Sequence, residues 1–183
     1  PRYIDVEIDR TNAIPGQGFY KTYDSSLFGG ISGYDFLNGQ AYVGTKISKS
    51  VDLQFGHGRH FIGEGIRSLL LSDYSHNYFY LRMSTKVWKF HYQNIFAELA
   101  AESGKDAVGN ELIPKKYMAA HYLDFKVSDR LTIGLFESVI YGRDNGIEIQ
   151  YLNPVILYRT VEQMLDSPDN VLLGLNFKWI PVK

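Results

Sequence analysis

The sequence contains no cysteine, so a disulfide framework and thiolate metal sites are excluded. It also has no run of about 18 apolar residues, the length from which a membrane-spanning helix is recognised. With a formal net charge of only −1, the chain offers no bulk electrostatic attraction to nucleic acid or to an anionic membrane surface. The chain begins at Pro1 without a signal peptide. We therefore expect either that a leader has been removed or that the sequence is a piece of a longer protein.

Aromatic residues and glycine are abundant instead. The 183 residues include 14 Tyr, 11 Phe and 17 Gly, a balance that favours an all-β protein over a helical one. The length suits one domain of ordinary size. A mean hydropathy of −0.19 is typical of a soluble protein, but also of a membrane β-barrel, whose strands carry apolar residues only at every second position.

Apolar and polar residues alternate with the two-residue period of a half-exposed strand through much of the chain. The predicted strands cover residues 41–48, 51–56, 79–84, 88–93, 122–127, 131–135 and 173–179, with a short strand at 147–149. The alternation blurs at 136–138. Tight turns are predicted at Lys49-Ser50, Thr85-Lys86 and Ser128-Asp129, and long connections at 57–77, 100–116 and 141–170.

The first 39 residues are expected to be irregular or partly stranded. Residues 3–9 alternate as a strand does. Residues 10–38 are rich in Gly, Ser and Asn, and Pro15-Gly16 and Gly29-Gly30 interrupt them. We interpret this stretch as loops with at most one irregular strand.

The order strand, short turn, strand, long loop occurs in three successive hairpins. Short turns on one rim and long loops on the other are typical of an outer-membrane barrel. We therefore predict that residues 1–183 are a single all-β unit, an antiparallel transmembrane β-barrel whose residues 40–180 form an antiparallel meander. A soluble β-sandwich is the alternative, because its strands also alternate and bury one face against a second sheet. Both folds accommodate the aromatic residues near strand ends, which are Tyr78, Tyr80, Trp88, Tyr92 and Trp179.

Three segments resemble the barrel of a known family. They are DLQFGHGRHFIGEGIRSLLLSDYSHNYFYLRMSTKVWKFHYQNIFAEL, LTIGLFESVIYG and IQYLNPVILYRTVEQMLDSPDNVLLGLNFKW. They are similar to outer-membrane proteins of Bacteroidetes in the Wzi-like capsule-assembly family, some of which are labelled gliding-motility proteins of the RemB type. The resemblance covers residues 40–179, and its most distinctive parts are FIGEGIRSLLLSD and YLNPVILYR.

The resemblance implies that this chain is a segment of a larger barrel in the bacterial outer membrane. It further implies a function in the assembly or surface attachment of capsular polysaccharide or exopolysaccharide, by glycan binding without catalysis and without a cofactor. The expected partners are surface polysaccharide and outer-membrane lipid, and no nucleic acid. One alternative is a structural component of a gliding-motility or protein-secretion complex, with other envelope proteins as partners. Another is a soluble all-β carbohydrate-binding protein or hydrolase.

The stretch between residues 54 and 84 holds most of the candidate ligand-binding groups, and we interpret its centre as an ordered loop or plug. Arginines bind anionic sugar groups or phosphate in a bidentate manner, and tyrosines offer stacking surfaces to sugar rings. The predicted binding residues are Arg59, Arg67, Arg82, Tyr74, Tyr78 and Tyr80, with Arg159 as a further cation. The alternative is that these arginines pair with Glu64, Asp73 and Glu162 to hold loops inside the lumen.

Histidines in the same stretch raise the question of a metal site. His57 and His60 lie near Glu64, and His76 or Asp73 would complete a set of ligands. However, the spacing H-G-R-H with glycine neighbours indicates a turn rather than a recognised metal site. We therefore predict no metal.

Catalytic residues are not predicted either. Two carboxylate pairs, Glu64 with Asp73 and Glu137 with Glu148, would suit a glycosidase only at a defined separation that the sequence does not give. A nucleophilic serine would need a histidine base within reach. Nothing in the sequence marks one serine beside any of the candidate bases, His57, His76, His91 and His121.

Overall fold

The computed structural model describes residues 7–14, 18–25, 31–35, 38–100, 115–142, 146–154 and 169–181. The first three of these ranges are the strands β1 (Glu7–Ile14), β2 (Gly18–Ser25) and β3 (Ile31–Asp35). They pair antiparallel in the order β1-β2-β3. The prediction of at most one irregular strand within 10–38 was therefore wrong. Residues such as Phe19, Tyr20 and Thr22 have high strand propensity, and the Pro-Gly and Gly-Gly breakers fall between the strands.

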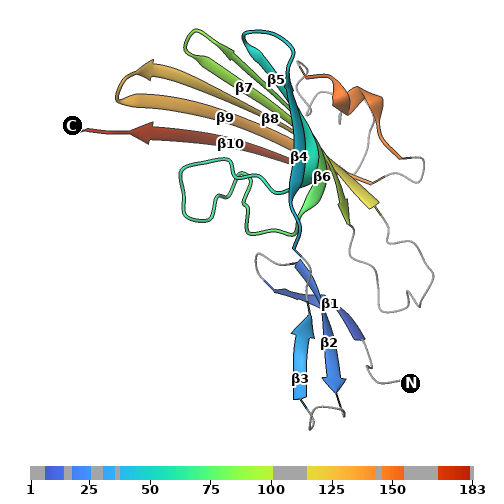
Figure 1. Ribbon diagram of the computed structural model, residues 1–183. Helices are drawn as coiled ribbons and strands as arrows, with labels where there is room; N and C mark the ends of the chain where they lie inside the picture. Colours follow the sequence, from blue (N-terminus) through green and yellow to red (C-terminus); the bar gives the residue numbers. More distant parts are fainter. Residues whose placement is uncertain are drawn as a thin grey trace.

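The main sheet has seven strands in an antiparallel meander, in the order β10-β9-β8-β7-β6-β5-β4 (Figure 1). The strands are β4 (Ala41–Lys46), β5 (Val51–Gly58), β6 (Tyr78–Val87), β7 (Phe90–Ala100), β8 (Lys115–Ser128), β9 (Leu131–Tyr141) and β10 (Asn170–Trp179). The all-β, antiparallel prediction is thus confirmed. Within the described residues the sheet is open, with β4 at one edge and β10 at the other.

No helix in the described ranges has the length and apolar character needed to cross a membrane.

The short strand predicted at 147–149 is absent, because the chain there leads into a single 3-10 turn, η2 (Ile149–Leu152). The predicted loops at 100–116 and 141–170, together with Arg159 and Glu162, lie partly or wholly outside the described residues.

Two tight turns differ from their predictions, and the β8–β9 turn, at Asp129-Arg130, does so by one residue. The β6–β7 hairpin turns at Trp88-Lys89, where Trp88 has a positive φ of 54°, and not at Thr85-Lys86. The two strands pair from Phe79↔Glu98 to Val87↔Phe90. The alternation of apolar and polar residues does not distinguish these two turn positions, because moving the turn along the chain shifts each cross-strand partner by an even number of residues and keeps every side chain on its face.

The register divides the main sheet into two unlike faces, because residues directly opposite each other in a ladder share a face. We call one the apolar face. A row such as Val43↔Phe55↔Leu81↔Phe96 runs across it from strand to strand. Exposed apolar side chains on this face are Val43, Phe55, Phe79, Leu81, Val87, Phe90, Ile133, Leu135, Leu173, Leu175, Phe177 and Trp179.

The other face, the polar face, carries rows such as Lys46↔Asp52↔Ser84↔Gln93. At the end nearer the long connections it also carries the main hydrophobic core. That core contains Tyr78, Tyr80, Ile95, Ala97, Met118, Ala120, Tyr122 and Phe136, and it is covered by Ile62 from the loop at 59–77. Figure 1 shows this loop on one side of the sheet and η2 on the other.

A second, smaller core lies on the apolar face at the same end of the sheet. Tyr151 of η2 is fully buried against Ala119, Val139 and Tyr141. Residues of β9 are therefore covered on both faces here, which explains why the sequence alternation blurs at 136–138. The same covered region holds a row of buried polar side chains, Asn94↔His121↔Glu137, on β7, β8 and β9.

Candidate functional site

The loop at 59–77 is held against the polar face by its own backbone and by packing. The backbone N–H of Ile62 donates to the carbonyl of Leu71 at 2.8 Å, and Ser68 Oγ donates to the carbonyl of Ile62. Leu70 packs against Gly174 of β10 so closely that a Cβ at Gly174 would meet its side chain. This anchoring agrees with the expectation of an ordered loop.

Tyr78 and Tyr80, two of the predicted binding residues, are only 6% and 5% exposed. The Tyr78 hydroxyl accepts a hydrogen bond from the backbone N–H of His60 at 3.1 Å. The ring of Tyr80 meets the His60 ring edge-on, with centroids 4.2 Å apart. Both tyrosines thus pack beneath the loop and offer no free surface to a sugar ring, in contrast to the role expected from the sequence.

His60 is neutral in this environment. Burial, together with the smaller effect of the nearby positive charge of Arg82, lowers its pKa to about 4. A neutral imidazole fits the packing against two tyrosine rings without an unpaired buried charge.

The exposed part of the loop brings together two other predicted binding residues. The Arg67 guanidinium lies over the Tyr74 ring at 4.5 Å from its centroid, and Tyr74 is 49% exposed. Arg59 instead donates from Nη1 to the carbonyl of Ser75 at 3.4 Å, which holds the loop together. Arg59 thus fastens the loop through a backbone carbonyl, while its pairing with a carboxylate stays a prediction.

Arg82 lies apart from these residues, on the polar face of β6. It lines a groove of about 360 Å³ with two further cations, Lys46 and Lys86, and with one carboxylate, Asp52. The rest of the lining is Gly44, Thr45, Leu53, Gln54 and Ser84. We call this the Arg82 groove. Its excess of cations suits an anionic group.

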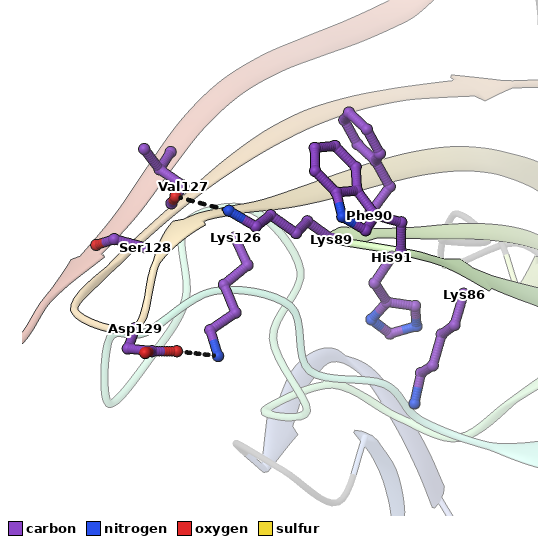
Figure 2. Close-up of a pocket in the computed structure, with 9 residues that line it drawn as sticks. Lys86, Lys89, Phe90, His91, Lys126, Val127, Ser128 and Asp129 are labelled. Atoms are coloured by element: carbon purple, nitrogen blue, oxygen red, sulfur yellow. Dashed lines mark hydrogen bonds and ion pairs between the residues drawn. The ribbon is translucent and has the colours of Figure 1, made fainter.

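A second groove, of about 660 Å³, lies at the rim where the short turns are (Figure 2). Lys86, Lys89 and Lys126 line it together with His91. Lys126 Nζ is 2.8 Å from Asp129, and its hydrogen bond lowers the pKa of that carboxyl. Lys86 lines both grooves, so the two grooves adjoin at this residue.

The structure also brings together a serine, a histidine and an aspartate, of which only the histidine, His91, is among the candidate bases named from the sequence. Ser84 Oγ lies 2.9 Å from Nε2 of His91, and His91 Nδ1 lies 4.0 Å from Oδ2 of Asp124. Asp124 is directly opposite His91 in the β7–β8 ladder, and Ser84 is diagonal to His91 across β6–β7. All three side chains are on the polar face.

Two of the candidate metal ligands are held apart by separate contacts. His57 Nδ1 is 2.9 Å from the carbonyl of Gly39 and its ring lies against Phe79, whereas His60 packs on Tyr80. Across the residues that the structure describes, no group of three His, Asp or Glu side chains is close enough to hold a metal ion.

The candidate carboxylates have separate surroundings too. Glu64 is 3.2 Å from Lys178 Nζ, which ties the loop to β10. Glu137 is buried on the apolar face, and Glu148 precedes η2.

In comparisons with known proteins, no family model, no curated protein and no solved structure matches the chain.

Proposed function

We propose that the seven-stranded sheet is part of the wall of an outer-membrane β-barrel that holds surface polysaccharide. The apolar face would meet lipid, and the polar face would line the lumen with the loop at 59–77 as an internal plug. The supporting observation is the set of exposed apolar side chains that runs across the sheet, including Phe55 at 58%, Leu135 at 55% and Leu175 at 68% exposure. Monomeric soluble proteins rarely leave so continuous an apolar surface uncovered.

The rim of short turns adds a second supporting feature. Phe90 and Phe125 stack with centroids 4.7 Å apart, and Trp88 lies 5.8 Å from Phe90. Trp179 is 66% exposed on the same face. Aromatic residues at such a level are typical of the girdle at a membrane interface.

Closure of this barrel requires strands beyond the seven described here. As far as the described residues go, the edge strands β4 and β10 each have backbone groups without a partner strand, which lipid does not tolerate. Further strands of the same protein would pair with these edges, as in the larger barrels that the sequence resembles.

Heat-modifiable migration and fractionation of the cell envelope test the barrel. The full-length protein is expected to require detergent, to fractionate with the outer membrane, and to migrate differently before and after boiling. A protein that is soluble without detergent and shows no shift would contradict the proposal.

Polysaccharide is assigned to the Arg82 groove because its lining carries three cations and one carboxylate. Arg82→Gln and Lys86→Gln are expected to weaken retention of an acidic polysaccharide on an affinity gel by about fivefold each. Lys89→Gln is the matched control, because Lys89 belongs to the same hairpin but lies outside the Arg82 groove. Equal retention of all three variants and the parent would remove this assignment.

A role as a structural partner in an envelope complex is the second candidate. The loop exposes Ile66 completely and Leu69 at 92%, and such apolar side chains favour a protein contact. Ile66→Ser combined with Leu69→Ser is expected to abolish co-purification of envelope proteins in this case, without changing polysaccharide retention.

A further inference from the structure

Ser84, His91 and Asp124 have the arrangement of a nucleophile, a base and the group that orients the base. The 2.9 Å separation between Ser84 Oγ and His91 Nε2 is within the range over which an imidazole removes a hydroxyl proton. Asp124 faces the other ring nitrogen at 4.0 Å, a separation that commonly tightens when substrate binds. Such sites are recognised by geometry and not by their order in the chain.

The surroundings of Ser84 supply a binding site and positive charge. Ser84 lines the Arg82 groove, and Arg82 and Lys86 lie two residues before and after it on the same face of β6. Figure 2 shows His91 and Lys86 pointing to one side of the sheet, and Phe90 to the other. Two cations beside the nucleophile favour the negative charge that develops on a carbonyl oxygen during attack.

The groove also limits the class of substrate. Its volume of about 360 Å³ and its lining, in which Leu53 is the single large apolar residue, suit a small polar molecule and not a long acyl chain. The excess of cations favours an anionic molecule. A short acyl ester on an anionic alcohol, such as an acylated acidic sugar, fits both features.

We infer that Ser84, His91 and Asp124 form a hydrolase site for short acyl esters of anionic molecules, an activity that goes beyond the proposed function. Ser84 Oγ attacks the ester carbonyl while His91 Nε2 takes the hydroxyl proton, and a tetrahedral oxyanion forms beside Arg82 and Lys86. The C–O bond to the alcohol breaks, His91 returns the proton to the leaving alcohol, and an acyl-serine remains. Water then gives a proton to His91 and attacks the acyl carbon. The bond between that carbon and Ser84 Oγ breaks, His91 returns the proton to Oγ, and the carboxylic acid is released.

A fluorophosphonate probe and p-nitrophenyl acetate test the site on the full-length protein in detergent. The parent is expected to be labelled at Ser84 and to hydrolyse the ester. Ser84→Ala and His91→Gln are each expected to lower kcat by roughly a hundredfold or more. Ser138→Ala is the matched control, because Ser138 is also buried on the polar face, at 5% exposure against 6% for Ser84, and is expected to retain full activity.

Asp124 acts as a positioning residue in this scheme, and its variant needs a readout of its own. Asp124→Asn is expected to lower kcat with little change in KM, since it disturbs the orientation of His91 and not the groove. Equal changes of KM in Asp124→Asn and Lys86→Gln would indicate a purely structural effect and count against the scheme.

Folding of each variant is checked by heat-modifiable migration, which also separates this inference from the proposed barrel. A heat-modifiable parent that is neither labelled nor active, or a Ser84→Ala variant that keeps its labelling, overturns the hydrolase site and leaves the barrel standing. If the parent is active and labelled but is soluble and not heat-modifiable, the hydrolase site is supported and the proposed barrel is refuted.

Discussion

The two ends of the seven-stranded sheet are built from the same alternating pattern but are covered differently. At the end with the short turns, the apolar face is exposed, with Phe177 at 66%, and the opposite face is polar. At the end with the long connections, the loop at 59–77 covers the polar face and η2 covers the apolar face. The turn end thus has two unlike surfaces, while the long-loop end has the covered faces and buried core of a soluble domain.

This difference in cover determines which side chains each end of the sheet accommodates. A polar row, Asn94↔His121↔Glu137, is buried on the otherwise apolar face, next to the residues of β8 and β9 that Tyr151 of η2 covers. Asn94 is fully buried, and neither the nitrogen nor the oxygen of its side-chain amide has a hydrogen-bond partner among the residues that the structure describes. Polar groups of this kind are costly in lipid. The cover at the long-loop end therefore permits a polar row on a face that is apolar elsewhere.

The largest expected effect comes from removing that cover. Tyr151 is fully buried, and its hydroxyl donates to Asp169 Oδ2 at 2.7 Å. Tyr151→Ala is expected to cost about 3–5 kcal/mol of local stability, as large-to-small changes of buried aromatics do. Hydrogen exchange should show lost protection in β8 and β9 near Val139, with the turn end unchanged.

Tyr151→Phe is the control for this variant. It keeps the ring in place and removes only the hydroxyl, so its cost is expected to be about 0.5–1.5 kcal/mol. Equal protection of β9 in Tyr151→Ala and the parent would show that η2 does not hold the cover.

A charged side chain on the apolar face of the turn end tests whether that face contacts lipid. Leu135 lies between Leu123 and Leu175 in the cross-strand row and is 55% exposed. Leu135→Arg is expected to destabilise the protein in lipid vesicles by about 2–4 kcal/mol, the usual cost of arginine on the lipid side of a barrel. Urea unfolding from vesicles measures it, with Leu135→Phe as the apolar control.

If this face met water instead, Leu135→Arg would leave the unfolding free energy within about 0.5 kcal/mol of the parent. That result would refute the lipid contact directly.

The sequence predicted most of the main sheet because alternation is a local signal. Strands such as β5 and β9 begin where the pattern begins, at Val51 and Leu131. The alternation is lost where both faces of the sheet are buried, as at 136–138. It also does not determine where along the chain a tight turn lies. Placing the turn at Thr85-Lys86 separated Ser84 from His91, whereas the turn at Trp88-Lys89 brings them to 2.9 Å.

The candidate binding residues depended on contacts between distant segments, which alternation does not encode. Tyr78 and Tyr80 have the same sequence features as an exposed stacking surface, and only the folded loop above them shows that they are buried. Lys46 and Lys86 were not selected: Lys46 is at a polar position of a predicted strand, and Lys86 was placed in the predicted turn at Thr85-Lys86. The register of the β4–β5–β6 ladders was needed to bring them to Arg82.

Acidification sharpens the comparison by loosening the cover that the loop at 59–77 forms at the long-loop end. His60 has a pKa of about 4 in the folded protein, below its ordinary value of 6.5. Because the pKa is lower in the folded state, the neutral His60 ring contributes fully to stability above pH 6.5. This contribution is progressively lost as the pH falls toward 4. The loss is expected to stay below about 3 kcal/mol, because part of the ring is still solvated.

Hydrogen exchange of the loop at 59–77, compared between pH 7 and pH 5, measures this loss. His60→Gln carries no titrating ring, so its loop protection is expected to vary much less over the same interval. A loop that is equally protected at both pH values in the parent would contradict the assignment of His60 as a buried neutral group.

The smallest expected effect concerns the exposed tip of the same loop. The Arg67 guanidinium lies 4.5 Å from the centroid of Tyr74, an exposed cation–π contact worth about 0.5–1 kcal/mol. Arg67→Ala is therefore expected to change loop protection by no more than this amount, while the buried anchors Ile62 and Leu71 keep the loop on the sheet. Arg67→Lys keeps the charge and serves as the control in the same exchange experiment. A loss of protection in Arg67→Ala as large as that in an Ile62→Ala variant would mean that the tip, and not the buried core beneath it, holds the loop in place.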